Sequence, residues 1–391
     1  MYPDSTGKRL DLFCQVIDNF GDAGVCWRLA RQLAGEYGFR VKLWVDKPAV
    51  LQKICPEIVP DRNEQEVAGV SVVRWPEVFP SVSTDDIPDV VVEGFGARLP
   101  ESYVRRMAER PHAPVWLNLE YLSAESWVGE SHLMASPQSW IPLTKYFYFP
   151  GFSANTGGLI REAGLFAERD AWQADSSAMS RFLPQGMADG AKDTERPLLV
   201  SLFCYPDAPV LSLFDLFGRC GQEVVCLVPE GVASAVLASF MQRSAQVGNR
   251  FRKGALTVRI LPMVPQANYD RLLWSCDLNF VRGEDSFVRA QWAARPFVWH
   301  IYPQEEDAHR VKLDAFLDCY LPGLPTAHAE TVRCFWYGWN GFDGMRCDGE
   351  TGEKFLEILP SLKQYNRDWA KKLALHADLA SGLVRFINTL R

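Results

Sequence analysis

Two aspartates four residues apart, Asp18 and Asp22, stand where an apolar segment gives way to a glycine-bearing turn, in LDLFCQVIDNFGDAGVCWRLARQL at 10–33. The apolar run ends at Ile17, and helical spacing follows the turn, which predicts a strand, a tight loop and a helix. At the carboxyl end of a strand such a pair can supply a general base and an assisting carboxylate. A structural interpretation also fits: Asp18 ends the strand in an Asx turn and Asp22 caps the helix.

A second group of polar residues lies in DLNFVRGEDSF, where a strand-like run leads into a helix predicted from Ser286. The fork of donors on Arg282 suits a diphosphate, and the helix N-terminus with the Ser286 hydroxyl would add an anion site. Glu284 and Asp285 would repel phosphate, so we expect them to bind ribose or sugar hydroxyls or to cap the helix. A capped surface turn is the structural alternative.

Aromatic and amide side chains follow three more predicted strands. Phe203 and Tyr205 come after LLVSL, Gln266 and Tyr269 come after LTVRILPMV, and Tyr302 comes after PFVWHI. Aromatic rings can stack on a nucleobase or cover a sugar, and an amide can bind a base edge. Each residue alone fits core packing equally well, but their common position at strand ends favours a ligand site.

Predicted strands and helices, which must position these residues, alternate along the chain. In the first half we predict strands at 10–17, 40–45, 71–74, 88–93, 115–119 and 145–149, and helices at 23–37, 48–54 and 100–110. A polar stretch at 165–196 is interpreted as a connection. From Pro197 a second strand-and-helix series follows, with helices at 208–219, 232–245, 266–275, 286–294 and 304–319 and a helical tail that includes 366–390. Such alternation predicts doubly wound parallel sheets.

Two Rossmann-like halves followed by a C-terminal helix are typical of the α/β GT-B glycosyltransferase fold, in which the halves face a cleft. We therefore predict an N-terminal domain at 1–185, a C-terminal domain at 186–361 and a helix at 362–391 that packs back on the N-terminal domain. A length of 391 residues agrees with two domains.

Composition narrows the functional classes. The net charge of −7 argues against a general nucleic-acid binder. No apolar run reaches the roughly 18 residues of a membrane span, and no signal peptide is evident, so we expect a cytoplasmic protein without a membrane partner. Ten cysteines form no CxxC and six histidines form no HxxxH, so we expect no metal site and no metal cofactor. Dinucleotide-binding, P-loop and GxSxG motifs are absent.

The segments VIDNFGDAGVCWRLARQL, VWLNLEYLSAESWV, YFPGFSANTGGLIRE and LPMVPQANYDRLLWSCDLNFVRGEDSFVRAQWAARPFVWHIYPQ together resemble the bacterial protein-arginine rhamnosyltransferases that modify elongation factor P. The resemblance extends over essentially the whole chain. It implies a GT-B fold and metal-free, inverting transfer of L-rhamnose from dTDP-β-L-rhamnose to an arginine nitrogen of elongation factor P. This modification supports the translation of polyproline stretches.

The resemblance also assigns residues. The paired catalytic aspartates fall on Asp18 and Asp22, with Asp22 the preferred base, and the N-terminal domain binds the acceptor. Nucleotide-sugar contacts fall on Phe203, Tyr205, Gln266, Arg282, Glu284, Asp285, Ser286 and Tyr302. Three other functions stay open from the residues alone: a GT-B enzyme with a small-molecule or lipid acceptor, a nucleotide-sugar epimerase, and a non-catalytic binding protein.

Overall fold

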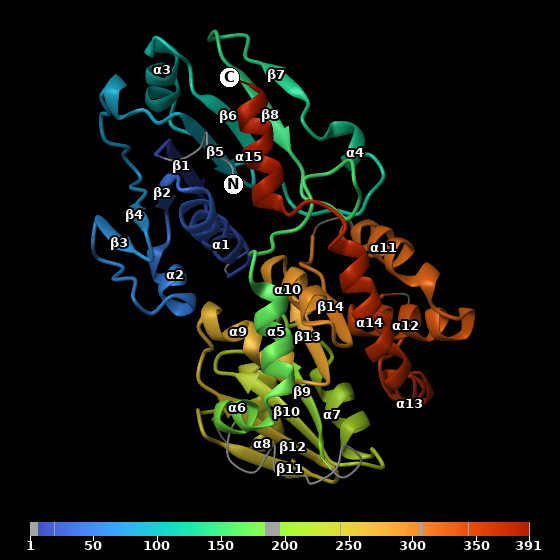
Figure 1. The fold of residues 1–391 in the computed structure, drawn as a ribbon. Coiled ribbons are helices and arrows are strands. Elements are labelled where there is room, and N and C mark those ends of the chain that lie inside the picture. The colour runs from blue at the N-terminus through green and yellow to red at the C-terminus, as the bar shows by residue number, and fades with distance from the viewer. Residues whose placement is uncertain are drawn as a thin grey trace. The chain divides into compact units, whose positions relative to one another are not determined.

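The computed structural model in Figure 1 describes residues 7–18, 20–183, 196–242, 244–304, 308–342 and 344–390. The chain divides into two compact units, Met1–Ala163 with Ala374–Arg391, and Gly164–Leu373. The units therefore change between 163 and 164 and again between 373 and 374. The first predicted boundary, between 185 and 186, lies outside the described residues, and the second was predicted between 361 and 362.

The first unit is a twisted sheet with helices beside it. Its elements are β1 (Arg9–Cys14), α1 (Phe20–Tyr37), β2 (Arg40–Val45), α2 (Pro48–Ile54), β3 (Glu64–Val67), β4 (Val70–Arg74), the 3₁₀ turn η1 (Thr84–Asp86), β5 (Val90–Gly94), α3 (Glu101–Glu109), β6 (Val115–Leu119), α4 (Val128–Ser131), β7 (Ala135–Pro137), β8 (Thr144–Tyr148) and α15 (Leu379–Thr389).

The strand order of this sheet is β3-β4-β2-β1-β5-β6-β8-β7. The six strands from β4 to β8 pair in parallel, and the short edge strands β3 and β7 pair antiparallel. Strand β1 pairs with both β2 and β5, so the order of winding reverses between β1 and β5. Open α/β sheets bind ligands at the carboxyl ends of the strands at such a switch point, and the Asp18–Asp22 loop follows β1.

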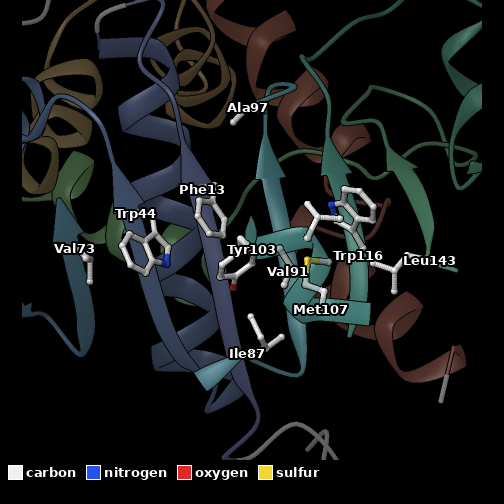
Figure 2. Close-up of a cluster of buried hydrophobic side chains, with 11 residues drawn as sticks. Phe13, Trp44, Val73, Ile87, Val91, Ala97, Tyr103, Met107, Trp116 and Leu143 are labelled. Atoms are coloured by element: carbon white, nitrogen blue, oxygen red, sulfur yellow. The ribbon is translucent and has the colours of Figure 1, made fainter. Parts of the chain in front are cut away.

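A buried cluster on one face of this sheet fixes the strands that carry the loop (Figure 2). Phe13 of β1 stacks on Trp44 of β2 with 5.7 Å between ring centroids. On the same face, Oδ2 of Asp11 accepts hydrogen bonds from Nε1 of Trp44 at 3.0 Å and from the hydroxyl of Tyr103 in α3 at 2.8 Å. Burial raises the pKa of the Asp11 carboxyl, and these two donors oppose the rise. The buried carboxyl therefore ties β1, β2 and α3 together.

The end of the chain returns to the first unit, as the predicted fold requires. Nε2 of Gln32 in α1 donates to Oδ1 of Asp378 at 3.2 Å, and Lys8 Nζ donates to Asn388 Oδ1 at 3.1 Å. The tail is not continuous over 366–390, however. Helix α14 (Leu359–Leu373) belongs to the second unit, and α15 starts anew because Asp378 caps it by accepting the N–H groups of Ala380 and Ser381.

The second unit is also a sheet with helices beside it. Its elements are α5 (Leu165–Ala174), α6 (Ser176–Phe182), β9 (Leu198–Leu202), α7 (Val210–Gly218), β10 (Val224–Pro229), α8 (Ser234–Met241), β11 (Arg250–Lys253), β12 (Leu256–Leu261), α9 (Gln266–Ser275), β13 (Leu278–Arg282), α10 (Asp285–Ala293), β14 (Phe297–His300), α11 (Ala308–Tyr320), η3 (Leu321–Gly323), α12 (Thr326–Trp339), α13 (Gly349–Glu357) and α14.

The strand order of the second sheet is β11-β12-β10-β9-β13-β14, parallel except for the edge strand β11. Its switch point lies between β9 and β13. The residues that follow these two strands, Phe203 and Tyr205 after β9 and Gly283 to Ser286 after β13, are therefore neighbours in space. Among the described residues no helix is long and apolar enough to cross a membrane.

Candidate active site

The loop after β1 is held by the side chain of Asp22. Asp22 lies in the first turn of α1 and is only 1% exposed. Its Oδ2 accepts the backbone N–H groups of Ile17 and Asp18, each at 2.7 Å. The strand consequently ends at Cys14, earlier than the predicted Ile17, because the backbone N–H groups of residues 17 and 18 bond to a side chain instead of to a neighbouring strand.

The environment of Asp22 makes it a stronger base than an exposed aspartate. Burial raises the pKa of the Asp22 carboxyl, and nearby Asp46 raises it further. The two backbone donors and a hydrogen bond with Tyr121 oppose this rise without cancelling it. A carboxylate whose pKa is raised above the usual aspartate value suits proton abstraction.

Tyr121 was not predicted, although it follows a predicted strand. Its ring stacks on Phe95, with centroids 4.6 Å apart, and Phe95 comes directly after β5. Gly94, which ends β5, has no room for a side chain, because a Cβ there would lie 2.9 Å from Sγ of Cys26 in α1. Tyr121, which follows β6, thus contacts Asp22, and Phe95, which follows β5, supports its ring.

Asp18 is half-buried and lies against the start of α1. A Cβ placed on Gly21 would be 2.6 Å from Oδ2 of Asp18, so the glycine leaves the space that this carboxylate occupies. The Gly21 N–H also donates to the Asp18 carbonyl oxygen at 2.7 Å. The structural alternative for the pair is therefore partly met, since Asp22 bonds the backbone before the helix. Asp18 lies in the loop and Asp22 in the first turn of α1, so both carboxylates stay at the start of this helix.

In the second unit the Arg282 guanidinium lies between two aromatic rings. Its Cζ is 4.5 Å from the ring centroid of Phe203 and 4.7 Å from that of Tyr205, and Nη1 donates to the Cys204 carbonyl oxygen at 3.2 Å. Cation–π contact with two rings holds the plane of the guanidinium. Tyr302, 39% exposed after β14, meets Tyr205 edge to face at 5.5 Å.

The turn after Arg282 is closed by Ser286. The Arg282 N–H donates to Oγ of Ser286 at 3.0 Å, and that hydroxyl donates back to the Arg282 carbonyl oxygen. Gly283 takes a φ of 58°, a conformation that favours glycine, and its carbonyl oxygen accepts Nε1 of Trp299 at 2.8 Å. Glu284 is the N-cap of α10, which starts one residue earlier than predicted, at Asp285.

Gln266 and Asp285 meet at the starts of two neighbouring helices. Nε2 of Gln266, the first residue of α9, donates to Oδ2 of Asp285 at 3.2 Å. Deeper between the helices, Arg289 of α10 makes a two-point ion pair with Asp270 of α9, with both N–O distances 2.7 Å. The structure thus brings the predicted residues of this unit into one cluster at the carboxyl edge of its sheet.

His300 belongs to this cluster and was missed. It is 3% exposed at the end of β14, and its Nδ1 accepts the backbone N–H of Tyr205 at 3.1 Å. Burial lowers the pKa of His300 to about 4. Its position at the end of a strand that neighbours β13 was a usable signal, but only the strand order of the folded sheet reveals the contact with Tyr205.

Comparison with known proteins agrees with this arrangement. The profile of the family described as "Elongation-Factor P (EF-P) rhamnosyltransferase EarP" matches residues 10–388. The chain belongs to the EarP family. It is 45% identical over 377 residues to the protein-arginine rhamnosyltransferase of Pseudomonas aeruginosa, covering 96% of this chain and 98% of that protein. It is 39% identical over 403 residues to that of Shewanella oneidensis, covering 99% of both.

Two solved structures have folds similar to that of this EarP family member. The structure that describes EarP-mediated arginine glycosylation of translation elongation factor EF-P is similar with a TM-score of 0.67 and 32% identity, covering 98% of this chain and 99% of that one. The spinosyn rhamnosyltransferase SpnG complexed with thymidine diphosphate is similar in fold alone, with a TM-score of 0.50 and 12% identity over 97% of this chain and all of that one. The predicted family and GT-B fold are confirmed, and the chain is a glycosyltransferase of the protein-arginine rhamnosyltransferase class.

Proposed function

We propose that this enzyme moves L-rhamnose from dTDP-β-L-rhamnose to one guanidinium nitrogen of an arginine on elongation factor P, with inversion at the sugar C1, in the cytoplasm. The observation that carries the proposal is the buried Asp22, in the first turn of α1, bonded to the backbone of Asp18 at the switch point of the first sheet. Membership of the EarP family supports the choice of sugar and of acceptor.

The protonated guanidinium of the acceptor arginine is a poor nucleophile. A guanidinium keeps its protons, since its pKa lies above about 12, and its nitrogen lone pair is unavailable for attack. We propose that Asp22 takes the proton while the nitrogen attacks C1, and that Asp18 holds the remaining N–H groups. A carboxylate binds guanidinium in a two-point geometry, which orients the plane of the nucleophile.

The donor half of the proposal rests on the cluster around Arg282. The rings of Phe203, Tyr205 and Tyr302 offer faces and edges for a thymine or a sugar. Arg282 and the N-terminal end of α10 would stabilise the negative charge that develops on the leaving diphosphate. Glu284, Asp285 and Gln266 supply acceptors and a donor for hydroxyl groups. Because Ser286 closes the turn, we expect it to support the site through Arg282 rather than as a separate anion ligand.

The test is direct. Wild-type protein is incubated with dTDP-rhamnose and folded elongation factor P, and the intact mass of the factor is measured. We expect the mass of one deoxyhexose to be added to a single arginine, and the anomeric configuration of the product, read by NMR, to be opposite to that of the donor. Transfer should persist in EDTA, because we propose no metal cofactor. Release of free rhamnose without modification of the factor, or epimerised donor, would contradict the proposal.

A further inference from the structure

A cavity of about 650 Å³ opens in the first unit, beside the loop that carries Asp18. Its lining includes Gln15, Asp46, Trp75, Glu77, Phe79 and Arg98. Gln15 follows β1, Asp46 follows β2 and Trp75 follows β4, while Arg98 lies shortly after β5. The cavity is therefore built at the same carboxyl edge of the sheet as the two aspartates.

The apolar part of the lining is held in place by the core. Trp75 lies edge to face against Phe13 at 5.2 Å, and Phe79 contacts Trp44 at 5.0 Å and Tyr103 at 5.6 Å. Both rings are only half-buried, and they pack against the cluster shown in Figure 2. Side chains that rest on a close-packed core keep a defined surface for a partner.

Two charged side chains of the lining, Glu77 and Arg98, have no polar partner within the described part of the chain. Glu77 and Arg98 are exposed, and neither side chain makes a hydrogen bond or ion pair with another described residue. Nearby exposed charges on α3 do pair, as in Arg106 with Glu109. The two free charges come from different loops, Glu77 from the one after β4 and Arg98 from the one after β5.

Hydrogen bonds connect the lining of the cavity to the loop that carries Asp18. Oδ1 of Asp46 accepts the Val16 N–H at 2.9 Å, and Lys47 Nζ donates to the Val16 carbonyl oxygen at 2.7 Å. Asp22 holds the next two N–H groups of the same loop. Asp18 is three positions after Gln15, a span of at most about 11 Å. A protein whose arginine reaches Asp18 can therefore place a second side chain in the cavity.

We propose that this cavity is the specificity site for the acceptor protein and takes a basic side chain that lies close to the target arginine. The inference rests on the proposed function. The carboxylates of Asp46 and Glu77 would pair with the cation, and the faces of Trp75 and Phe79 would cover its stem. Arg98, after β5, would bind an acidic group or a carbonyl oxygen of the acceptor. The two loops would therefore select an acceptor segment that presents a basic group to Glu77 and an acidic group or carbonyl oxygen to Arg98.

Selectivity has to come from such a contact. A pair of aspartates binds any exposed guanidinium, and exposed arginines are abundant on proteins. Binding energy from a remote side chain both raises the affinity for the correct acceptor and positions its arginine for reaction. We therefore expect a folded acceptor domain to be a far better substrate than free arginine, which cannot occupy the cavity.

The test compares Glu77→Gln and Glu77→Lys with wild type in transfer to folded elongation factor P. We expect the KM for the acceptor to rise about tenfold in Glu77→Gln and further in Glu77→Lys, with dTDP affinity and thermal stability unchanged because the residue is exposed. Arg98→Gln should raise the same KM. Glu109→Gln, an exposed change on α3 outside the cavity, is the matched control and should leave the KM unchanged.

The outcomes separate the two proposals. If the Glu77 and Arg98 variants keep the wild-type KM, the specificity site is elsewhere and this inference is wrong, while the proposed function stands. If wild-type protein itself does not modify the factor, the proposed function fails first. A KM that rises in Glu77→Gln and rises equally in Glu109→Gln would mean a general charge effect and would also overturn the inference.

Discussion

Oδ2 of Asp22 accepts the backbone N–H of Asp18 at 2.7 Å, so the two acidic residues are joined by a hydrogen bond through the main chain of the loop. One side chain thus sets the position of the other. The Ile17 N–H donates to the same oxygen, so Asp22 fixes two successive residues of the loop. Any change at Asp22 acts in two ways, through the lost carboxylate and through the loop that carries Asp18.

Asp22→Asn and Asp22→Ala separate these two effects. The amide oxygen of asparagine can still accept the backbone N–H groups but cannot take a proton, so we expect transfer to fall at least about 100-fold with little change in melting temperature. Alanine removes the acceptor as well, and should also destabilise the fold, because the N–H groups of Ile17 and Asp18 lose their partner. Single-turnover transfer measures the loss of activity, and thermal unfolding measures the loss of stability.

The Asp22 variants should bind dTDP like wild type, because the proposed donor contacts are in the second unit. Near-normal turnover in Asp22→Asn would move the base to Asp18. If dTDP affinity fell together with turnover, the loss of activity would no longer report on the base.

Gly21→Ala should make the enzyme much less active while making it slightly more stable. A Cβ at this position would lie 2.6 Å from Oδ2 of Asp18 and would push that carboxylate aside. Alanine is favoured over glycine within a helix by roughly 0.5–1 kcal/mol, so α1 itself gains. We expect kcat to fall about tenfold or more. Gly35→Ala in the same helix, where a Cβ meets nothing within 4 Å, is the control and should gain stability without losing activity.

The sequence predicted the buried parallel strands and their helices closely. The bounds of β2, α2, β6 and α9 coincide with the predictions, because apolar runs between turn residues define a central strand or its covering helix. The edge strands β3, β7 and β11 were missed. Their sequences EQEV, ASP and RFRK are short and mostly polar, and antiparallel pairing at a sheet edge leaves no apolar run to detect.

The site was predictable as a set of strand ends but not as a set of contacts. Sequence spacing placed Asp18 with Asp22 and Arg282 with Ser286, since the members of each pair are only four positions apart where a strand leads into a helix. The meeting of Tyr205 with His300, 95 residues apart, depends on the order β9-β13-β14, which no local pattern specifies. Asp46 and Tyr121 were missed for the same reason, because both reach Asp22 from other strand ends.

Arg282→Ala and Arg282→Lys should both weaken dTDP binding. Alanine removes the charge proposed to face the diphosphate. Lysine keeps a charge but cannot lie flat between Phe203 and Tyr205 while donating to the Cys204 carbonyl oxygen, since it has no planar fork. We expect dTDP affinity measured by calorimetry to fall about tenfold or more in both, and equally for dTDP-rhamnose. Wild-type affinity in Arg282→Ala would place the phosphate site elsewhere.

His300 should make the protein less stable in mild acid. Burial, with the charges of Arg282 and His309, lowers the pKa of His300 to about 4 against the opposing effect of Asp207. In the unfolded chain the histidine titrates near its usual 6.5. Between pH 6.5 and 4 the unfolded state therefore binds a proton that the folded state does not, so stability is complete above about pH 6.5 and declines as the pH falls. Removal of the ring should remove this part of the decline.

The comparison that isolates His300 uses two variants. His300→Asn keeps an oxygen able to accept the Tyr205 N–H, so we expect near-normal dTDP affinity and a flatter dependence of melting temperature on pH between 6.5 and 4. His300→Leu leaves that N–H without an acceptor and should lower dTDP affinity about tenfold through a displaced Tyr205. His112→Asn, at an exposed site, should retain the wild-type pH dependence. His132, whose pKa burial also lowers to about 4, contributes equally to every protein compared. An unchanged pH dependence in His300→Asn would mean that the buried ring titrates in the folded protein as it does in the unfolded chain.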